Sequence, residues 1–355
     1  MNSENNTLVI LTPGFPESEA DTTCLPMQQS FVKCLKEKYP KFNIIVLSFQ
    51  YPYHKKTYKW FDITVTGFDG KNKGGLPRLL LRRKLMTRLN EINSKNRIIG
   101  ILSFWVGECA WVGKNFANKH NIKQYCWILG QDARKENKYP KRIHAKENEL
   151  IALSDFVQEE FEKNHGIRPQ HVIPAAINSR LFSDMQQERD IDILAAGSLI
   201  PLKQYDVFVE IIAEIKNELP HIKVMLVGDG PEKEKLQTFI AGSGLQSNII
   251  LTGELPHPEV LQQMQRAKIF LHPSSYEGFS GVCLEALAVG EHVISFCRAM
   301  KQDIEHWHIV QSKEEMKEKA LEILQSPSTI YKSVTPFSMD DTVKKMVELF
   351  TRLSG

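Results

Sequence analysis

The sequence predicts an α/β protein of two domains, each with a mostly parallel sheet covered by helices. Short apolar runs, such as residues 43–47, alternate with segments of helical period along most of the chain, which is the pattern of repeated βα units. The alternation stops in a polar, turn-rich stretch over residues 178–189 and starts again at residues 192–196. The chain has 355 residues, 42% of them apolar, which is enough for two cores. We therefore expect an N-terminal domain over residues 1–178 and a C-terminal domain over residues 190–335.

Composition and charge argue against several classes of protein. The formal net charge of +3 is too small for a protein that coats nucleic acid, so we expect no nucleic-acid partner. The six cysteines form no C-x-x-C pair, which favours a reduced, cytoplasmic protein. The first residues lack the basic region of a signal peptide, and no apolar stretch approaches the length of a transmembrane helix. Any membrane contact is expected to be peripheral.

The most informative stretch covers residues 272–290, HPSSYEGFSGVCLEALAVG. It follows a buried-strand pattern and leads into an apolar helical run, so its loop lies at the carboxyl end of a strand, where open α/β sheets bind ligands. Residues 278–281 would offer backbone N–H groups and the positive end of a helix to an anion such as phosphate. Carboxylates beside a phosphate would repel it, so Glu277 and Glu285 are expected to face hydroxyl groups.

The spacing Glu277-x7-Glu285, with Glu-Gly-Phe and Leu-Glu-Ala around the two glutamates, resembles the signature of family-4 retaining glycosyltransferases of the GT-B fold. That resemblance implies two Rossmann-like domains that face each other across a cleft, and a nucleotide-diphosphate sugar as the donor. It also implies that Glu277 holds hydroxyls of the donor sugar and Glu285 the ribose hydroxyls. The residues whose amides would hold the sugar or phosphate are Gly278, Phe279, Ser280 and Gly281. The alternative is a pair of ordinary glutamates on a βα unit.

A second anion site is expected after the strand at residues 192–196. Its loop resembles the family pattern G-R-L-x-x-x-K, whose arginine and lysine clamp the diphosphate. Lys203 matches the lysine, and Ser198 replaces the arginine, which removes a bidentate donor. Either Arg134 or Arg298 is a candidate to replace it, or the site holds phosphate less tightly. A solvent-facing lysine is the alternative for Lys203.

Two further strand ends complete the donor site that the resemblance implies. Gly228 follows the strand at residues 223–227, and Leu255 follows the strand at residues 248–251. The family places the nucleotide base against these strand ends. After the strand at residues 292–296 the family's glycine-rich turn is missing, which marks a divergent branch of the bacterial surface-polysaccharide type.

The first strand, at residues 8–12, ends in a loop that contains Gly14. The loop lacks G-x-G-x-x-G, which removes most support from a dinucleotide-binding oxidoreductase. By the resemblance, Gly14 lets the donor phosphates or the acceptor come close. An ordinary βα turn is the alternative.

Strands expected at residues 98–102 and 125–129 end in loops with polar side chains. The candidate contacts to donor or acceptor hydroxyls are Glu108, Gln131 and Asp132. Loop capping is their alternative role. The family often has a His-Gly pair where Leu129 and Gly130 stand, so a usual contact to the donor sugar is missing. By the resemblance, the first domain binds the acceptor, and a helix over residues 339–355 crosses back onto it.

Residues 49–75 mix aromatics, lysines and glycines without a helical period, which suits a binding loop. Residues 78–88 then predict a basic amphipathic helix, with Glu91 as the acidic residue opposing its charge. A solvated face is one interpretation, and contact with anionic lipid or a lipid-linked phosphate acceptor is the other. The residues proposed for that contact are Arg78, Arg82, Arg83 and Arg88. A helix is also expected over residues 147–164, with Ser154 inside it.

The expected reaction is retaining glycosyl transfer without a metal, and Lys203 and Glu277 are the candidate catalytic residues. Lys203 and the amides near Ser280 can stabilise charge on the departing nucleotide diphosphate, and the histidines form no ligand cluster, so no metal or other cofactor is expected. We expect a saccharide or lipid-linked acceptor in cell-surface polysaccharide or glycolipid synthesis, in the cytoplasm or on the inner face of the cell membrane. The alternatives are a sugar-nucleotide epimerase or phosphorylase, and a catalytically weak binding subunit, which Ser198 and Leu129 motivate.

Overall fold

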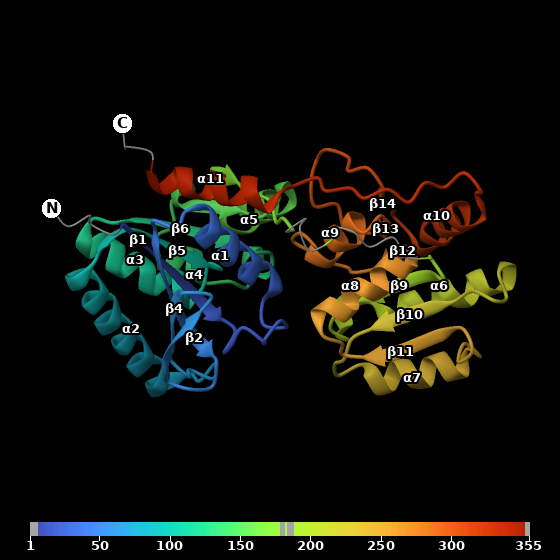
Figure 1. The fold of residues 1–355 in the computed structure, drawn as a ribbon, viewed down its shortest axis with the longest axis horizontal. Coiled ribbons are helices and arrows are strands. Elements are labelled where there is room, and N and C mark those ends of the chain that lie inside the picture. Colours follow the sequence, from blue (N-terminus) through green and yellow to red (C-terminus); the bar gives the residue numbers. More distant parts are fainter. Residues whose placement is uncertain (1–5, 178–181, 183–187, 352–355) are drawn as a thin grey trace. The chain divides into compact units, whose positions relative to one another are not determined.

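The computed structural model describes residues 6–177, 182 and 188–351. The chain forms two compact units. One comprises Met1–Ala176 with Met339–Gly355, and the other comprises Ile177–Ser338. Each unit contains a sheet with helices, so the predicted α/β class is confirmed (Figure 1). Most of the polar stretch over residues 178–189, in which the sequence places the domain boundary, lies outside the described residues.

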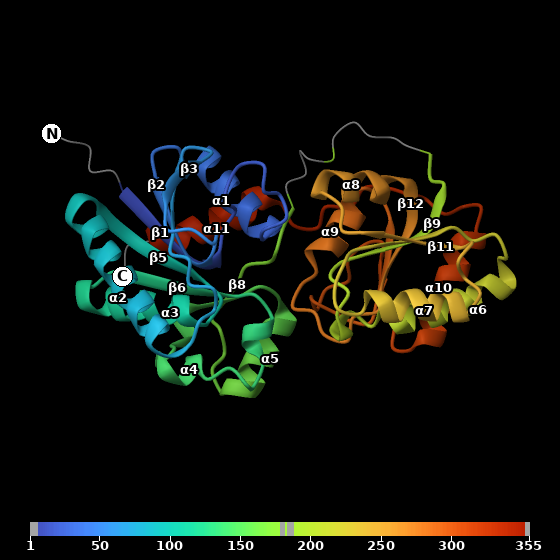
Figure 2. The ribbon, with the colours of Figure 1, turned by 90° about the horizontal axis from the view of Figure 1, so that it is seen from below.

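The first unit contains an eight-stranded sheet in the order β3-β4-β2-β1-β5-β6-β7-β8. Its strands are β1 (Asn6–Gly14), β2 (Asn43–Tyr51), β3 (Thr57–Trp60), β4 (Ile63–Gly67), β5 (Arg97–Phe104), β6 (Lys123–Ile128), β7 (Leu150–Ala152) and β8 (His171–Val172). All neighbouring strands are parallel except the β3–β4 pair. The central strands are apolar on both sides because helices cover both faces of the sheet (Figure 2).

The helices of the first unit are α1 (Pro26–Lys38), α2 (Gly75–Lys95), α3 (Glu108–His120), α4 (Tyr139–Arg142), α5 (Asp155–His165) and α11 (Met339–Thr351). On one face, α2 and α3 share an apolar cluster with Val9 and Ile101. On the opposite face α11 packs beside α1, although the two are far apart in sequence. The ring of Phe350 in α11 lies against Gly100 of β5, where a Cβ would come within 2.1 Å of it. The C-terminal helix is therefore part of the first unit.

The second unit contains a six-stranded parallel sheet in the order β11-β10-β9-β12-β13-β14. Its strands are β9 (Ile191–Ala196), β10 (Val224–Val227), β11 (Ile249–Gly253), β12 (Ala267–His272), β13 (His292–Ser295) and β14 (Trp307–Ile309). Its helices are α6 (Tyr205–Glu218), α7 (Lys233–Gly242), α8 (His257–Arg266), α9 (Gly281–Ala288) and α10 (Lys313–Gln325). Because all six strands are parallel, their carboxyl ends meet at one edge, which positions the loops described below.

Two sequence predictions of secondary structure are wrong. The stretch at residues 49–75 contains the hairpin β3–β4 within the expected loop. The expected helix at residues 147–164 begins only at Asp155, because Leu150–Ala152 forms the buried strand β7 and Ser154 caps the helix by accepting from Val157 N at 3.1 Å.

Candidate active site

The carboxyl ends of β9, β10 and β11 are held together at glycines that leave no room for side chains. Gly197 N donates to Val227 O at 3.0 Å, and Gly228 N donates to Gly253 O at 2.9 Å. A Cβ at Gly228 would lie 2.0 Å from Gly197 O, and φ at Gly228 is +148°, so only glycine fits there. Gly228, a predicted donor contact, thus has a packing role in this edge of the sheet.

Lys203 and Glu277 meet at the same edge, although they are 74 positions apart in sequence. Lys203 ends the short helix η4 (Pro201–Lys203) after β9, and Glu277 lies in the loop after β12. Lys203 Nζ donates to Glu277 Oε2 at 2.5 Å. The two loops are also joined through the main chain, since Ser275 N donates to Leu202 O at 3.1 Å. The structure therefore brings the two candidate catalytic side chains into direct contact.

The protonation state of Glu277 depends on His272 and Lys203. His272 is the last residue of β12 and is 2% exposed, and its Nε2 lies 3.4 Å from Glu277 Oε2. Burial alone would raise the pKa of Glu277, but the contacts with His272 and Lys203 outweigh burial and lower that pKa to about 2. Burial lowers the pKa of His272, so its ring is neutral at pH 7. Glu277 is thus an ionised hydrogen-bond acceptor at neutral pH.

Glu285 lies on α9 and contacts His257, the first residue of α8. His257 Nε2 and Glu285 Oε1 are 2.7 Å apart. The hydrogen bond to Glu285 raises the pKa of His257, and burial only partly opposes it. The pair joins α9 to the loop after β11, which carries the half-buried Leu255. A ribose hydroxyl at Glu285 would therefore bind beside an imidazole that can also donate or accept.

The N-terminus of α9 has space for a ligand. Ser280 is the N-cap, and its Oγ accepts from Cys283 N at 3.4 Å. Phe279 is buried, with its ring 5.8 Å from that of Trp307, so this predicted donor contact can act through its backbone rather than its side chain. At Gly281 a Cβ would meet no atom within 4 Å. The positive end of the helix dipole is therefore open beside Gly281, as an anion site requires.

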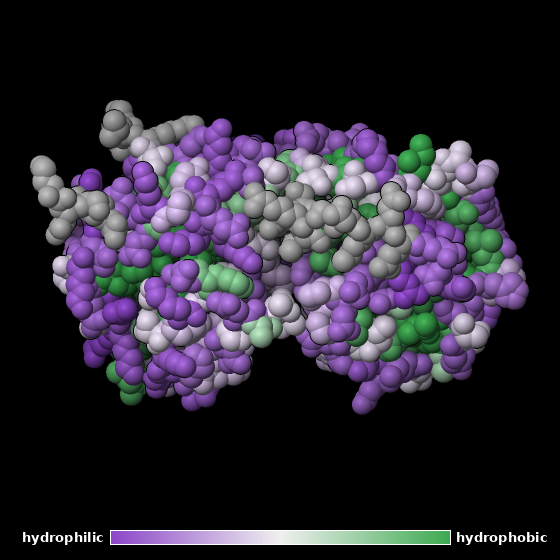
Figure 3. Space-filling model, in the orientation of Figure 1, coloured by the Kyte–Doolittle hydropathy of each residue, from purple (hydrophilic) through white to green (hydrophobic). Residues whose placement is uncertain are grey.

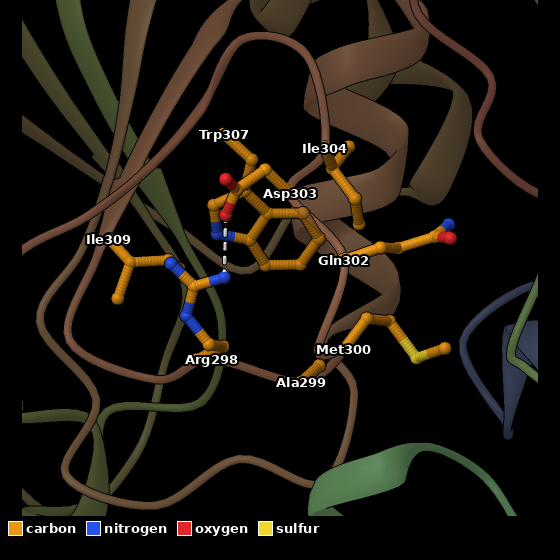
Figure 4. A pocket seen from close by; sticks show the side chains of 8 residues that line it. All are labelled: Arg298, Ala299, Met300, Gln302, Asp303, Ile304, Trp307 and Ile309. Carbon is orange, nitrogen blue, oxygen red and sulfur yellow. Dashed lines mark hydrogen bonds and ion pairs between the residues drawn. The ribbon is translucent and has the colours of Figure 1, made fainter.

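The loop after β13 contains Arg298, one of the two candidates to replace the arginine that is missing at the exposed Ser198. Arg298 Nη1 lies 2.6 Å from Asp303 Oδ1, within a small pocket that Trp307 also lines (Figure 4). Its guanidinium is thus engaged inside its own loop. The other candidate, Arg134, belongs to the first unit.

In the first unit, Asp132 caps the loops after β5 and β6. Its side chain accepts from Val106 N at 2.7 Å, Leu129 N at 2.9 Å and Gly130 N at 3.0 Å. The residue is 8% exposed, and burial raises the pKa of its carboxyl to about 6 despite these hydrogen bonds. The structure therefore gives Asp132 the capping role that was the alternative to ligand contact.

Glu108, at the start of α3, pairs with cations of α2. Its Oε1 accepts from Arg82 Nε at 2.8 Å and lies 3.7 Å from Arg78 Nε, and its Oε2 accepts from Gln50 at 3.2 Å. The expectation that Glu91 alone opposes the basic helix is therefore wrong, because Glu108 also pairs with two of its arginines. Gln131, by contrast, is exposed.

At Gly14, the last residue of β1, the surrounding atoms would leave room for a larger side chain. A Cβ there would meet the nearest atom, Cys24 Sγ, at 3.7 Å, which is an ordinary contact distance. Its proposed part in the approach of a ligand stays a prediction.

The exposed side of α2 combines apolar and basic residues. Leu76 is 67% exposed, Leu79 47% and Leu80 45%, and these positions share a helix face with the exposed Arg83 and Lys84. Hydrophobic atoms lie at the lower end of α2 beside hydrophilic ones (Figure 3). We call these five residues the α2 surface. The apolar stripe that the sequence predicts points instead into the core, through the set Leu81, Leu85, Leu89 and Ile92.

Two histidines in the second unit, His257 and His272, have no role in the sequence prediction. Each lies at the end of a strand or the start of a helix next to a predicted glutamate contact. The sequence signal that could have found them is their position at the carboxyl ends of predicted strands, where polar residues face ligands.

Within residues 6–177, 182 and 188–351, no three His, Cys, Asp or Glu side chains are grouped so as to hold a metal ion. In the same residues, no helix combines the length and hydrophobicity needed to span a bilayer. All six cysteines are free.

Residues 181–329 match the family model described as glycosyl transferases, group 1. This range lies entirely within the second unit and contains Lys203, Glu277 and Glu285. The match supports the coarser part of the sequence prediction, a relationship to group 1 glycosyltransferases. The assignment to family 4 stays a proposal.

Curated relatives of the chain are glycosyltransferases. One is the 2-deoxystreptamine N-acetyl-D-glucosaminyltransferase of Niallia circulans, 27% identical over 43% of this chain and 37% of that protein. Another is the phosphatidylinositol N-acetylglucosaminyltransferase GPI3 subunit of Saccharomyces cerevisiae, 27% identical over 52% of this chain and 46% of that protein. The chain thus spans less than half the length of these two relatives.

Solved structures share the whole fold. The Anabaena protein HepE, solved with UDP and glucose, has a TM-score of 0.72 at 16% identity and covers 98% of this chain and 100% of its own. Sucrose-phosphate synthase of Thermosynechococcus elongatus has a TM-score of 0.72 at 17% identity, and the match covers 97% of this chain and 98% of that one. The predicted GT-B architecture, two α/β units of this kind, is therefore confirmed.

Proposed function

We propose that this protein is a retaining, metal-independent glycosyltransferase of family 4 that uses a nucleotide-diphosphate sugar. The observation that carries the proposal is the contact between Lys203 and Glu277 at the carboxyl edge of the second sheet, inside the range that matches the glycosyltransferase family. A cation and an ionised acceptor at one point suit a donor that combines a diphosphate with sugar hydroxyls.

Lys203 would meet the charge that grows on the departing diphosphate. Lysine has three N–H donors, and the hydrogen bond to Glu277 uses one of them, so two can reach phosphate oxygens. The open helix end beside Gly281 adds positive potential at the same edge. Together these groups supply electrostatic stabilisation of the transition state without a metal.

Glu277 is suited to hold sugar hydroxyls rather than to transfer protons. Because its pKa is lowered to about 2, it carries no proton to donate at neutral pH, and it is a weak base. Glu285 would hold the ribose hydroxyls next to His257, and Leu255 would lie near the base. The amides of residues 278–281 would contact the sugar or phosphate.

The first unit would bind the acceptor, a saccharide or a lipid-linked sugar. Of the three polar candidates, Asp132 and Glu108 are engaged with the protein, so Gln131 is the side chain best placed to meet a ligand. The α2 surface would contact anionic lipid, because Arg83 and Lys84 supply charge and the exposed leucines supply apolar area. We propose that the enzyme works in the cytoplasm or on the inner face of the membrane, in cell-surface polysaccharide or glycolipid synthesis.

The donor is best sought among UDP-sugars, since UDP is bound in the solved structures of HepE and of pneumococcal GtfA. A thermal-shift screen with UDP, GDP, ADP and CMP would identify the base. Turnover would then be followed with UDP-glucose and UDP-N-acetylglucosamine, with and without saccharide acceptors. Transfer or donor hydrolysis above background is the expected result. Isomerised donor in the absence of acceptor would indicate an epimerase. Turnover that depends on phosphate would indicate a phosphorylase, and nucleotide binding without turnover would indicate a binding subunit.

A further inference from the structure

Trp105 adopts a backbone conformation that tryptophan rarely occupies. Its φ is +63°, in the left-handed region, and it begins a γ-turn centred on Val106, since Gly107 N donates to Trp105 O at 2.9 Å. The left-handed region is uncommon for residues other than glycine, and a bulky side chain makes it still less favourable. Strain of this kind persists only where the surrounding structure fixes it, and it is concentrated at functional sites.

The neighbouring structure fixes Trp105 from both sides. Trp105 N donates to Trp127 O at 2.9 Å, which extends the pairing of β5 with β6. The next residue, Val106, is buried, and its N donates to Asp132 Oδ2 at 2.7 Å while its O accepts from Asn137 Nδ2 at 2.8 Å. Asp132 thus acts as a positioning residue that holds the turn.

The turn lies where a ligand is expected on topological grounds. In the first sheet, β1 has β2 on one side and β5 on the other, so the chain reverses its direction of travel across the sheet between β1 and β5. Ligands of open α/β sheets bind at the carboxyl ends of the strands at such a switch point. Trp105 follows the last residue of β5, and Ser103 of β5 pairs with Leu11 of β1.

The side chain of Trp105 is available at this position. It is half-buried, whereas Trp60 and Trp127 are fully buried. Next to it a Cβ at Gly107 would meet no atom within 4 Å, and no side chain caps the first turn of α3. The half-buried Trp105 thus precedes a turn whose Gly107 adjoins open space at the start of α3, where no side chain caps the helix.

We infer that Trp105 is an aromatic platform for a neutral hexopyranose ring of the acceptor. A pyranose presents an apolar C–H face, which packs on an indole, and hydroxyls at its edge, which the α3 amides and the exposed Gln131 can meet. The inference rests on the proposed function, because it takes the first unit as the acceptor side. It also assigns Asp132 a positioning role, because this carboxylate would hold the turn at Val106 and would not itself contact the acceptor.

The platform is tested by kinetics with two substrates. Trp105→Asn is the main variant, because asparagine tolerates the left-handed backbone, and Trp105→Phe keeps a ring. We expect Trp105→Asn to raise KM for the saccharide acceptor about tenfold, the scale of one lost stacking partner, with Trp105→Phe intermediate. Hydrolysis of the donor by water should keep its rate and its KM. The matched control is Trp111→Asn, since Trp111 is also half-buried but lies under Arg82 at 4.4 Å.

A direct titration separates failure of the platform from failure of the proposed function. Tryptophan fluorescence of the wild type should change saturably with methyl α-glucoside or methyl α-N-acetylglucosaminide, and the change should vanish in Trp105→Asn and persist in the Trp111 control. A wild type that responds to glycoside but neither transfers nor hydrolyses donor would refute the glycosyltransferase proposal alone. Unchanged acceptor KM in Trp105→Asn, or a raised donor KM and altered UDP binding, would overturn the platform. If Trp105→Asn does not fold, the titrations of the wild type and of Trp105→Phe decide the question. A wild type whose fluorescence does not respond to either glycoside would overturn the platform.

Discussion

Lys203 and Glu277 form a 2.5 Å ion pair between two loops that are 74 positions apart in sequence. A donor diphosphate that reaches Lys203 must share its ammonium with this carboxylate, and a sugar hydroxyl that reaches Glu277 binds beside the same cation. The pair therefore couples the two ends of one donor molecule. It also makes the two residues separable by experiment, because they meet different parts of that donor.

Lys203→Ala is expected to lower kcat about 10²- to 10³-fold, because one contact to charge that grows in the transition state is worth roughly 3–4 kcal/mol. The free energy of unfolding should fall by less than the roughly 3–4 kcal/mol lost from transition-state stabilisation, since His272 still contacts the carboxylate of Glu277. Steady-state kinetics and thermal unfolding measure the two effects. Lys235→Ala is the matched control, as Lys235 is 61% exposed and pairs with Asp206 and Glu232 away from Glu277. Near-native kcat in Lys203→Ala would show that this loop does not hold the diphosphate.

Glu285→Gln is expected to weaken binding of bare UDP about 10- to 100-fold, because a ribose hydroxyl loses a charged acceptor worth about 1.5–3 kcal/mol. Glu277→Gln should leave UDP affinity within about threefold and lower transfer, because the sugar is absent from UDP. Calorimetry with UDP and kinetics with the UDP-sugar separate these outcomes. Equal losses of UDP affinity in both variants would refute the division of roles.

The His257–Glu285 pair predicts a pH-dependent stability. The pKa of His257 is raised from 6.5 by its hydrogen bond to Glu285, so the stabilisation is fully present below the unfolded pKa and is lost as pH rises through the folded pKa. The difference in Tm between wild type and His257→Asn should therefore shrink from pH about 5.5 to pH about 8.5. Thermal unfolding across that range measures it. A constant difference would mean that the ring does not titrate against Glu285.

The sequence predicted the strands of both sheets where apolar runs are bounded by turns, and failed where that signal is weak. Strand β7 has only three residues, Leu150–Ala152, which are too few to show a period. The β3–β4 hairpin turns at Phe61 and Asp62, with φ of 42° and 62°, and this pair lacks the glycine or asparagine that usually marks such a turn.

The candidate site was predicted as a set of residues but not as a set of contacts. Motif spacing located Glu277 and Glu285, yet their partners His272 and His257 come from other strand ends, and spacing contains no information on which loops adjoin. The same limit applied to Glu108, whose pairing with Arg82 depends on how α2 packs against α3. The basic helix predicted at residues 78–88 therefore included two arginines, Arg78 and Arg82, that the fold pairs with Glu108.

The last prediction concerns the α2 surface and anionic membranes. Arg78 and Arg82 are paired with Glu108, and Arg88 with Glu91, so we expect the exposed Arg83 and Lys84 to supply the charge that acts on a bilayer. Each basic residue near an anionic surface contributes about 1 kcal/mol, and this attraction is screened over roughly 10 Å at 0.1 M salt. Changing both to Gln should lower affinity for phosphatidylserine vesicles about 30-fold at low salt, and Leu79→Ser with Leu80→Ser should weaken binding at all salt concentrations because it removes apolar area.

Vesicle co-sedimentation at low and high salt measures this prediction, and UDP binding checks that the second unit is intact. The matched control changes Lys119 and Lys163, two exposed lysines on α3 and α5, to Gln, which removes the same charge elsewhere on the first unit. The control should bind vesicles almost as the wild type does. If the wild type stays in the supernatant at low salt, the α2 surface is a solvated face and the acceptor is more simply a soluble saccharide. If the Arg83/Lys84 variant and the Lys119/Lys163 variant lose vesicle binding equally, the attraction depends on net charge alone. The α2 surface then has no special part in membrane binding.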